Sequence, residues 1–384
     1  MQFRSIFVCN YRDLRIAINT RLLVPNKLDG IGYFAHEVLQ RLVKNAPQHQ
    51  FIFVFDRKPH ADFIYDSNVE TVVIPPQARH PILYYIWFHL SIPLFLKRKK
   101  IDLFLSPEGY LPSLKAVPLV NVIHDLNFEH QPEDLPLSER WYYRRFFPRY
   151  AKKANHIITV SDFSKQDIIS LYGIRADKIS TIHNGIRAVF KPQQQRIEEN
   201  IVKGSPYFLA VGTIHPRKNI EGLLAGFNQF KTTDNQGIKL VIAGRKKWWT
   251  ESMEKAYESS PYKDDILFLG RLKTEELVKA YQGATALLML SNFEGFGLPI
   301  VEAMACGCPV ICSNIPAFKE VAQKAALIVD KDNPSDIAAS MTAIANNGEQ
   351  REKLIKAGYE ISKQFSWDTA AKEVQQIIEE HGKA

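Results

Sequence analysis

The sequence predicts an α/β protein built from two doubly wound domains, each a parallel sheet with helices on both faces. The chain has 384 residues, more than the ~100–200 residues that a single domain usually holds. Short apolar runs rich in β-branched residues alternate with longer amphipathic stretches, an order typical of parallel sheets. The same alternation starts again after a polar gap that begins near residue 188. We therefore expect two similar domains that face each other across a cleft.

In the first half, seven short apolar runs have the composition of buried strands. They are Leu14–Asn19, Gln50–Phe55, Thr71–Ile74, Leu103–Ser106, Leu119–Ile123, His156–Val160 and Lys178–Ile182. Helical spacing of apolar residues occurs between them, over Tyr33–Lys44, Glu139–Ala154 and Ser161–Tyr172. Ser161 is a suitable N-cap because its hydroxyl can accept a hydrogen bond from the first turn of the helix that follows.

The second half repeats this pattern with six further strands. They are Tyr207–Val211, Lys239–Ala243, Ile266–Leu269, Thr285–Leu290, Pro309–Cys312 and Ala326–Val329. We place the first domain at residues 1–187, a linker at 188–205, the second domain at 206–365 and a C-terminal helix at 366–384. That last helix has the length to pack back on the first domain. Residues 1–12 precede the first clear strand and are interpreted as an appendage.

The basic excess of the chain lies entirely in its first half. Residues 1–187 hold 25 basic and 17 acidic residues, whereas residues 188–384 hold 24 of each, which gives the net charge of +8. An anionic partner should therefore meet the first domain. Basic and aromatic residues are mixed over residues 141–153. A second basic group, Lys97–Lys100, follows directly after the apolar run 81–96. This composition fits contact with an anionic membrane surface; the alternative is that the aromatics are core and the charges its solvated edge.

Other classes of protein fit less well. The apolar run 81–96 falls short of the ~20 residues that a spanning helix needs, and we expect it to pack in the core. No secretory signal and no nucleic-acid-binding module are visible. The four cysteines (Cys9, Cys306, Cys308 and Cys312) lack the spacing of zinc ligands or of a disulfide framework. We interpret them as small buried residues of a cytoplasmic protein.

In open α/β sheets, ligands bind at the carboxyl ends of the strands, so the loops there are the candidate site. Gly30 and Gly32 follow the first strand, directly before a helix that we expect from Tyr33, where backbone N–H groups could approach an anion. An ordinary loop-to-helix turn is the alternative at this position. Arg217 and Lys218 follow Gly212 at the equivalent place in the second half, where two cations suit a diphosphate; a solvated basic turn is the alternative.

The stretch of residues 291–310 carries the densest set of candidate groups. Residues Gly295, Phe296, Gly297 and Leu298 are expected to form a loop, because it contains two glycines, and its N–H groups can face a ligand. Pro299 suits the first turn of the helix that follows. Glu302 lies one turn into that helix, so Glu294 and Glu302 are expected to flank one pocket. A carboxylate there can accept hydrogen bonds from vicinal sugar hydroxyls. For Glu302, favourable placement in the helix dipole is the simpler alternative.

Glu294 and Glu302, with seven residues between them inside EGFGLPIVEAMACGCPV, resemble the E-x7-E motif of the retaining GT-B glycosyltransferases of family 4. The resemblance extends to Gly30–Gly32, to His124–Asp125, to Asn184–Gly185 and to Gly212–Asn219. It covers roughly residues 14–375. The chain looks most like bacterial mannosyltransferases of O-antigen and exopolysaccharide assembly.

This resemblance implies a role for each matched residue. Glu302 would bind the ribose of a nucleotide diphosphate sugar, best matched by GDP-mannose, and Glu294 with the backbone of residues 295–298 would hold the sugar. Lys218 and Arg217 would neutralise the departing diphosphate without a metal ion or another cofactor. His124 would line the sugar and acceptor side. Many family members have an arginine directly after the glycine of the 212 turn, whereas this chain has Thr213.

The implied partners are a nucleotide-sugar donor and a glycan or lipid-linked acceptor, at the inner face of the cell membrane. Three alternatives remain at this point: a UDP-sugar donor, a sugar-nucleotide epimerase or hydrolase of GT-B shape, and a non-catalytic binder. An epimerase or hydrolase would need further carboxylates, and a binder should have lost Lys218, Glu302 or the Gly32 loop, all of which are present. An Asp-x-Asp sequence, Asp330 to Asp332, has the spacing of a metal-binding motif but lies away from these loops, and we interpret it as a turn.

Overall fold

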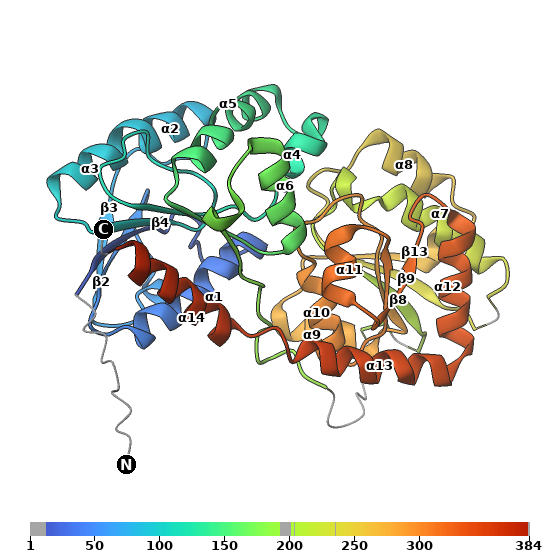
Figure 1. Ribbon diagram of the computed structural model, residues 1–384. Helices are drawn as coiled ribbons and strands as arrows, with labels where there is room; N and C mark the ends of the chain where they lie inside the picture. The colour runs from blue at the N-terminus through green and yellow to red at the C-terminus, as the bar shows by residue number, and fades with distance from the viewer. Residues whose placement is uncertain (1–12, 193–200, 203, 235, 383–384) are drawn as a thin grey trace, which may run out of the picture.

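The computed structural model describes residues 13–192, 201–202, 204–234 and 236–382. These residues form two parallel sheets, each with helices on both sides, and the two sheets lie side by side in an elongated molecule (Figure 1). The expected fold class is thus confirmed.

The first sheet has the strand order β3-β2-β1-β4-β5-β6-β7, with every neighbouring pair parallel. Its strands are β1 (Arg15–Asn19), β2 (Gln50–Phe55), β3 (Val69–Val73), β4 (Leu103–Ser106), β5 (Leu119–Val122), β6 (His156–Thr159) and β7 (Ile179–Thr181). Its helices are α1 (Gly30–Asn45), α2 (Pro81–Ile86), α3 (Ile92–Arg98), α4 (Asn127–His130), α5 (Leu137–Lys153) and α6 (Asp162–Tyr172).

The second sheet has the order β10-β9-β8-β11-β12-β13, again all parallel. Its strands are β8 (Tyr207–Val211), β9 (Lys239–Ala243), β10 (Ile266–Gly270), β11 (Ala286–Met289), β12 (Val310–Ser313) and β13 (Ala326–Val329). The helices that follow β8 are α7 (Ile220–Lys231), α8 (Glu251–Glu258), α9 (Thr274–Gly283), α10 (Leu298–Ala305), α11 (Pro316–Ala322), α12 (Pro334–Asn346), α13 (Gly348–Ser362) and α14 (Trp367–His381).

Each of the predicted strands forms, with small differences at the ends. Strand β3 begins at Val69, two residues before the predicted start, because Glu70 is a strand residue although it is charged. Such a charge is tolerated on an edge strand, where one side of the backbone faces water. Helix α1 begins at Gly30 rather than at Tyr33, since Asp29 is its N-cap and accepts a hydrogen bond from Gly32 N at 3.2 Å.

The apolar run 81–96 is only partly core. A π-helical turn over Trp87–Ser91 joins α2 to α3. Trp87 and Phe88 are fully buried, but Ile82, Leu90 and Leu94 on the other face are more than half exposed. The expectation that the run packs in the core is confirmed for the face that carries Trp87 and Phe88 and not for the opposite face, because apolar residues surround the helix while only one side of it meets the sheet.

The chain crosses between the two sheets at two adjacent points. Gly185 follows β7, and a Cβ atom added there would lie 2.1 Å from the backbone nitrogen of Trp367, where α14 begins. Helix α14 then packs against α1 of the first sheet, as Figure 1 shows in dark red beside blue. Of the predicted linker, residues 193–200 and 203 lie outside the described residues, while Phe190 is buried against Tyr281.

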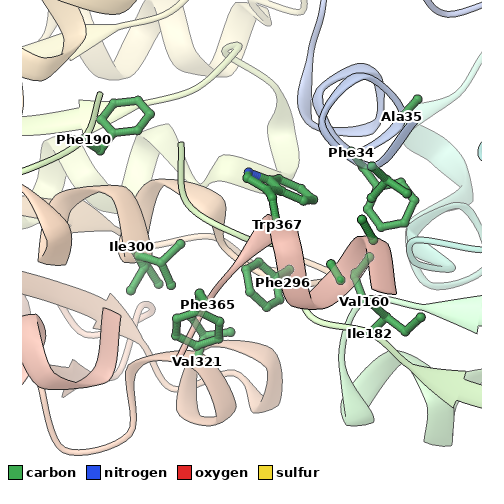
Figure 2. Close-up of a cluster of buried hydrophobic side chains, with 14 of the residues drawn as sticks. Phe34, Ala35, Val160, Ile182, Phe190, Phe296, Ile300, Val321, Phe365 and Trp367 are labelled. Atoms are coloured by element: carbon green, nitrogen blue, oxygen red, sulfur yellow. The ribbon is translucent and has the colours of Figure 1, made fainter. Parts of the chain in front are cut away.

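A single apolar cluster spans both sheets. Phe34 of α1 and Val160 after β6 belong to it together with Phe296, Phe365 and Trp367 from the second half of the chain (Figure 2). Burying large apolar side chains gives ~1.5–3 kcal/mol each, so this cluster holds the two domains to each other. Cys306, Cys308 and Cys312 are buried free thiols, as expected, while Cys9 and the rest of residues 1–12 lie outside the described residues.

Candidate active site

Two loops of the second sheet meet at the edge that faces the first domain. Strands β8 and β11 are parallel neighbours, so the segments that leave their carboxyl ends run side by side. The backbone nitrogen of Asn292 donates a hydrogen bond to the carbonyl of Arg217 at 2.7 Å, which joins the loop 212–219 to the loop 291–298. We call the second of these the donor loop.

Gly212 makes room for the lysine of this site. Its φ of +134° lies in a region that favours glycine. A Cβ atom added to it would lie 3.2 Å from Cε of Lys218, so the lysine side chain folds back over the end of β8. Lys218 closes a single 3-10 turn, and Asn219 then caps α7.

Two cations share one carboxylate at the centre of the site. Nζ of Lys218 and Nη1 of Arg217 each lie 2.5 Å from Oε1 of Glu294, and the Ser291 hydroxyl donates to the same oxygen at 3.1 Å. Burial favours the neutral acid, but the two cations outweigh it and hold the pKa of Glu294 at about 2. Burial lowers the pKa of Lys218 despite the nearby carboxylate. The cluster keeps a net positive charge, which suits a diphosphate.

The donor loop ends at the N-terminus of α10. Gly297 is the residue before the helix, with a φ of +113°, and Pro299 occupies the first turn as expected. Phe296 is buried in the shared apolar cluster, whereas Leu298 lies opposite α1. A Cβ atom added to Gly30 would lie 3.8 Å from Cδ1 of Leu298, so the first turn of α1, which includes Gly32, faces the start of α10.

His124 closes the first-domain side of this site. It follows β5, and its Nε2 donates to the carbonyl of Pro107 at 2.9 Å, since a carbonyl can only accept. Burial lowers the pKa of His124, which favours a neutral ring whose Nδ1 can accept a hydrogen bond from a hydroxyl. The ring packs edge-on against Phe34 at 5.0 Å.

Glu302 lies in a separate environment from Glu294. Its carboxylate accepts a hydrogen bond from the Tyr281 hydroxyl at 3.1 Å and lies 3.7 Å from Nη2 of Arg187. Burial is the dominant effect and raises the pKa of Glu302 to about 7 in spite of Arg187. The guanidinium of Arg187 also lies over the ring of Tyr33, 4.2 Å from its centre. Sequence reasoning missed Arg187 and Tyr281, and nothing in their local sequence marks them.

Other polar residues named in the sequence analysis or lying near the site form turns or contacts between the domains. Asp330 accepts a hydrogen bond from the backbone nitrogen of Asp332 at 3.0 Å, so this pair forms a turn as predicted. His215 caps the 3-10 turn at Arg217 and lies 3.5 Å from Asp134 of the first domain. Arg271 donates to the carbonyls of residues 26 and 28, both at 2.9 Å, and so connects the loop before α1 to the second domain.

The basic and aromatic face of the first domain is open to solvent on α5. Leu137 is 80% exposed and Trp141 is 62% exposed, next to Arg140, Arg144 and Arg145. Among the described residues, we find no helix with both the length and the apolar character that crossing a bilayer would require.

Two parallel-sheet α/β domains, joined by a double crossover and facing each other at their strand ends, define the class of GT-B glycosyltransferases. The chain matches the model of "Glycosyltransferase Family 4" over residues 28–189 and the model of "Glycosyl transferases group 1" over residues 192–361. The chain belongs to these glycosyltransferases, and the resemblance inferred from the E-x7-E motif is confirmed.

Two mannosyltransferases of bacterial O-antigen chains align with most of this chain. The chain is 29% identical over 356 residues to O-antigen chain mannosyltransferase B of Escherichia coli, covering 89% of this chain and 93% of that one. It is 29% identical over 298 residues to O-antigen chain mannosyltransferase RfbU of Salmonella typhimurium, with 75% and 79% covered.

Solved structures agree on the fold. Sucrose-phosphate synthase from Thermosynechococcus elongatus superposes with a TM-score of 0.77 at 18% identity, over 96% of this chain and 99% of that one. WaaG, a glycosyltransferase involved in lipopolysaccharide biosynthesis, gives 0.74 at 13% identity over 94% and 99%. HepE of Anabaena, solved with UDP and glucose, gives 0.72 at 15% identity over 96% and 100%.

Proposed function

We propose that this glycosyltransferase moves mannose from GDP-mannose to a glycan or lipid-linked saccharide in the synthesis of a cell-surface polysaccharide, with retention of the anomeric configuration. The observation that carries the proposal is the cluster of Arg217, Lys218 and Glu294 at the ends of β8 and β11, with its net positive charge. The two O-antigen mannosyltransferases that align with most of this chain support the choice of sugar.

In the proposed reaction, the bond between the anomeric carbon and the diphosphate oxygen breaks as the acceptor hydroxyl forms its bond to the same face of that carbon. The acceptor proton moves to the leaving phosphate oxygen, so no protein base is needed. Negative charge builds on the diphosphate, and Lys218 and Arg217 stabilise it where it develops. Glu302 holds the ribose, while Glu294 and the backbone of the donor loop hold the sugar. No metal ion or organic cofactor takes part in this scheme.

A UDP-sugar donor is the second candidate, because the Anabaena neighbour of the same fold was solved with UDP and glucose. A thermal-shift screen separates the two, since a ligand at 100 times its dissociation constant stabilises a protein by ~2.7 kcal/mol. We expect GDP and GDP-mannose to raise the melting temperature and UDP, UDP-glucose and ADP to leave it unchanged. A response to uridine nucleotides alone would refute the mannose donor, and no response to any nucleotide would refute the donor site.

The retaining outcome has its own test. With the donor that binds and a mannose-containing oligosaccharide as acceptor, NMR of the product gives the anomeric configuration of the new linkage. An α product from an α-linked donor supports the proposed same-face attack. A β product would overturn it.

We also propose that the enzyme works at the inner face of the cell membrane, held there by α5. Leu137 and Trp141 are exposed beside three arginines, and each cation near an anionic surface gives ~1 kcal/mol. The purified chain should sediment with vesicles that contain anionic phosphatidylglycerol and not with neutral phosphatidylcholine vesicles. The double variant Arg144→Glu with Arg145→Glu should lose this binding and keep its melting temperature. Equal binding of the variant would refute the role of α5.

A further inference from the structure

The N-terminus of α6, in the first domain, makes direct contact with the donor loop of the second. Ser161 is the N-cap of α6, and its hydroxyl oxygen accepts a hydrogen bond from Ser164 N at 3.0 Å. The same hydroxyl donates to the carbonyl of Gly295, in the second domain, at 2.6 Å. Ser161 and Ser164 are both fully buried. Ser161 therefore does two things at once: it caps a helix of one domain and holds a backbone carbonyl of the other.

Ser164 lies between His124 of the first domain and the donor loop of the second. Its hydroxyl lies 3.1 Å from the carbonyl oxygen of His124 and 3.4 Å from that of Gly295. Gly295 itself approaches so closely that an added Cβ atom would lie 2.6 Å from the His124 carbonyl. The Ser164 hydroxyl thus lies between His124 of the first domain and the donor loop of the second, with the shorter of its two contacts to the His124 carbonyl.

Glu320 of α11 holds α6 in this place. Its carboxylate accepts hydrogen bonds from the backbone nitrogens of Asp162 and Phe163 at 2.8 and 3.1 Å, and lies 2.8 Å from Nε2 of His183. The first N–H groups of a helix have no partner within the helix, and a negative charge is favoured at that end. A carboxylate from the second domain therefore satisfies the first turn of a helix in the first domain.

We propose that Ser161 and Ser164 are positioning residues of the glycosyl transfer reaction. By holding the carbonyl of Gly295, they fix the preceding residue, Glu294, over Lys218 and Arg217, and they set the distance between the donor loop and His124. Glu320 keeps α6 in register with the loop. This inference rests on the donor site proposed above but goes beyond it, because it gives a role to two serines that contact the donor loop and His124 only through backbone carbonyls.

The test compares three single serine variants and one double variant in the full chain. Ser164→Ala removes the bridging hydroxyl and leaves the cap made by Ser161 intact. Ser161→Thr keeps a hydroxyl with both hydrogen bonds and should retain most activity. Ser170→Ala, at an exposed position near the other end of α6, is the matched control and should behave as the unchanged protein. Turnover is measured with whichever nucleotide sugar the unchanged protein uses, at a temperature well below the melting point of each variant.

We expect Ser164→Ala to lower kcat by about 10- to 100-fold, with a smaller change in donor affinity. Adding Ser161→Ala to it should lower kcat further, because this removes the shorter hydrogen bond to the Gly295 carbonyl together with the N-cap of α6. A lower melting temperature with unchanged kcat would show a structural role only and overturn the inference. If the unchanged protein turns over none of the donors, the proposed function fails instead. In that case a crystal structure of Ser164→Ala tests the positioning role. A shifted donor loop supports the inference, and a donor loop that has not moved overturns it.

Discussion

Replacing Glu302 by glutamine should make the protein more stable at alkaline pH and lower its affinity for the donor. Burial raises the pKa of Glu302 to about 7 from the 4.5 of a free glutamate, so the folded chain holds this proton more tightly than the unfolded chain does. Stability from this group is greatest below pH 4.5 and is lost as the pH rises from 4.5 to 7. Relative to a group that stays neutral, Glu302 lowers the stability by ~3 kcal/mol at pH 8, where it is ionised in both states, and by about 1 kcal/mol at pH 5, where only the unfolded chain has lost the proton.

The assay is thermal unfolding of the unchanged protein and of Glu302→Gln at pH 5 and pH 8. Glutamine keeps an acceptor for the Tyr281 hydroxyl but carries no charge, so the variant should gain ~2 kcal/mol more at pH 8 than at pH 5, a shift of several degrees. Glu352→Gln, at an exposed position on α13, should show no such dependence. An equal difference in melting temperature at both pH values would refute the argument from the buried carboxylate.

Three further variants test other parts of the molecule. Lys218→Ala should lower kcat ~10²–10³-fold, as for the loss of one transition-state donor, while calorimetry shows a smaller loss of donor affinity; near-normal turnover would remove Lys218 from the mechanism. Gly185→Ala places a methyl group against the Trp367 backbone and should cost ~1–3 kcal/mol of stability, read as a lower melting temperature; an unchanged value would contradict the tight crossing. The hydrogen bond to Glu320 raises the pKa of His183, so this pair stabilises the protein fully below about pH 6.5 and loses that effect as the pH rises through the raised pKa. In Glu320→Gln, melting curves recorded from pH 6 to 9 should lack this loss, and an identical pH profile would argue against the pair.

The fold could be predicted from the sequence because parallel strands buried on both faces are short, continuous apolar runs. The same reasoning found Lys218, Arg217 and Glu294, since the carboxyl ends of β8 and β11 meet at one edge and the loops there carry the charges. Each of these residues is marked by its place after a strand. The roles assigned to them remain predictions.

Other parts of the site depend on contacts between distant segments and could not be predicted. Arg187 reaches Glu302 from the start of the polar gap, where the sequence indicates only a linker. Ser161 was expected to cap α6, and it does, but the second hydrogen bond of its hydroxyl crosses to Gly295. The burial that raises the pKa of Glu302 comes from residues of several elements at once, which no local pattern reveals.

The return of α14 to the first domain has a consequence for how the chain folds as it is synthesised. The face of α1 that carries Phe34 is covered by Trp367, whose ring lies 6.0 Å away, and Arg41 of α1 pairs with Asp368 at 2.6 Å. The ribosome makes α1 early and α14 only after the entire second sheet. The nascent first domain therefore leaves the ribosome with an apolar helix face uncovered, and it completes its own core only once the second domain has been translated.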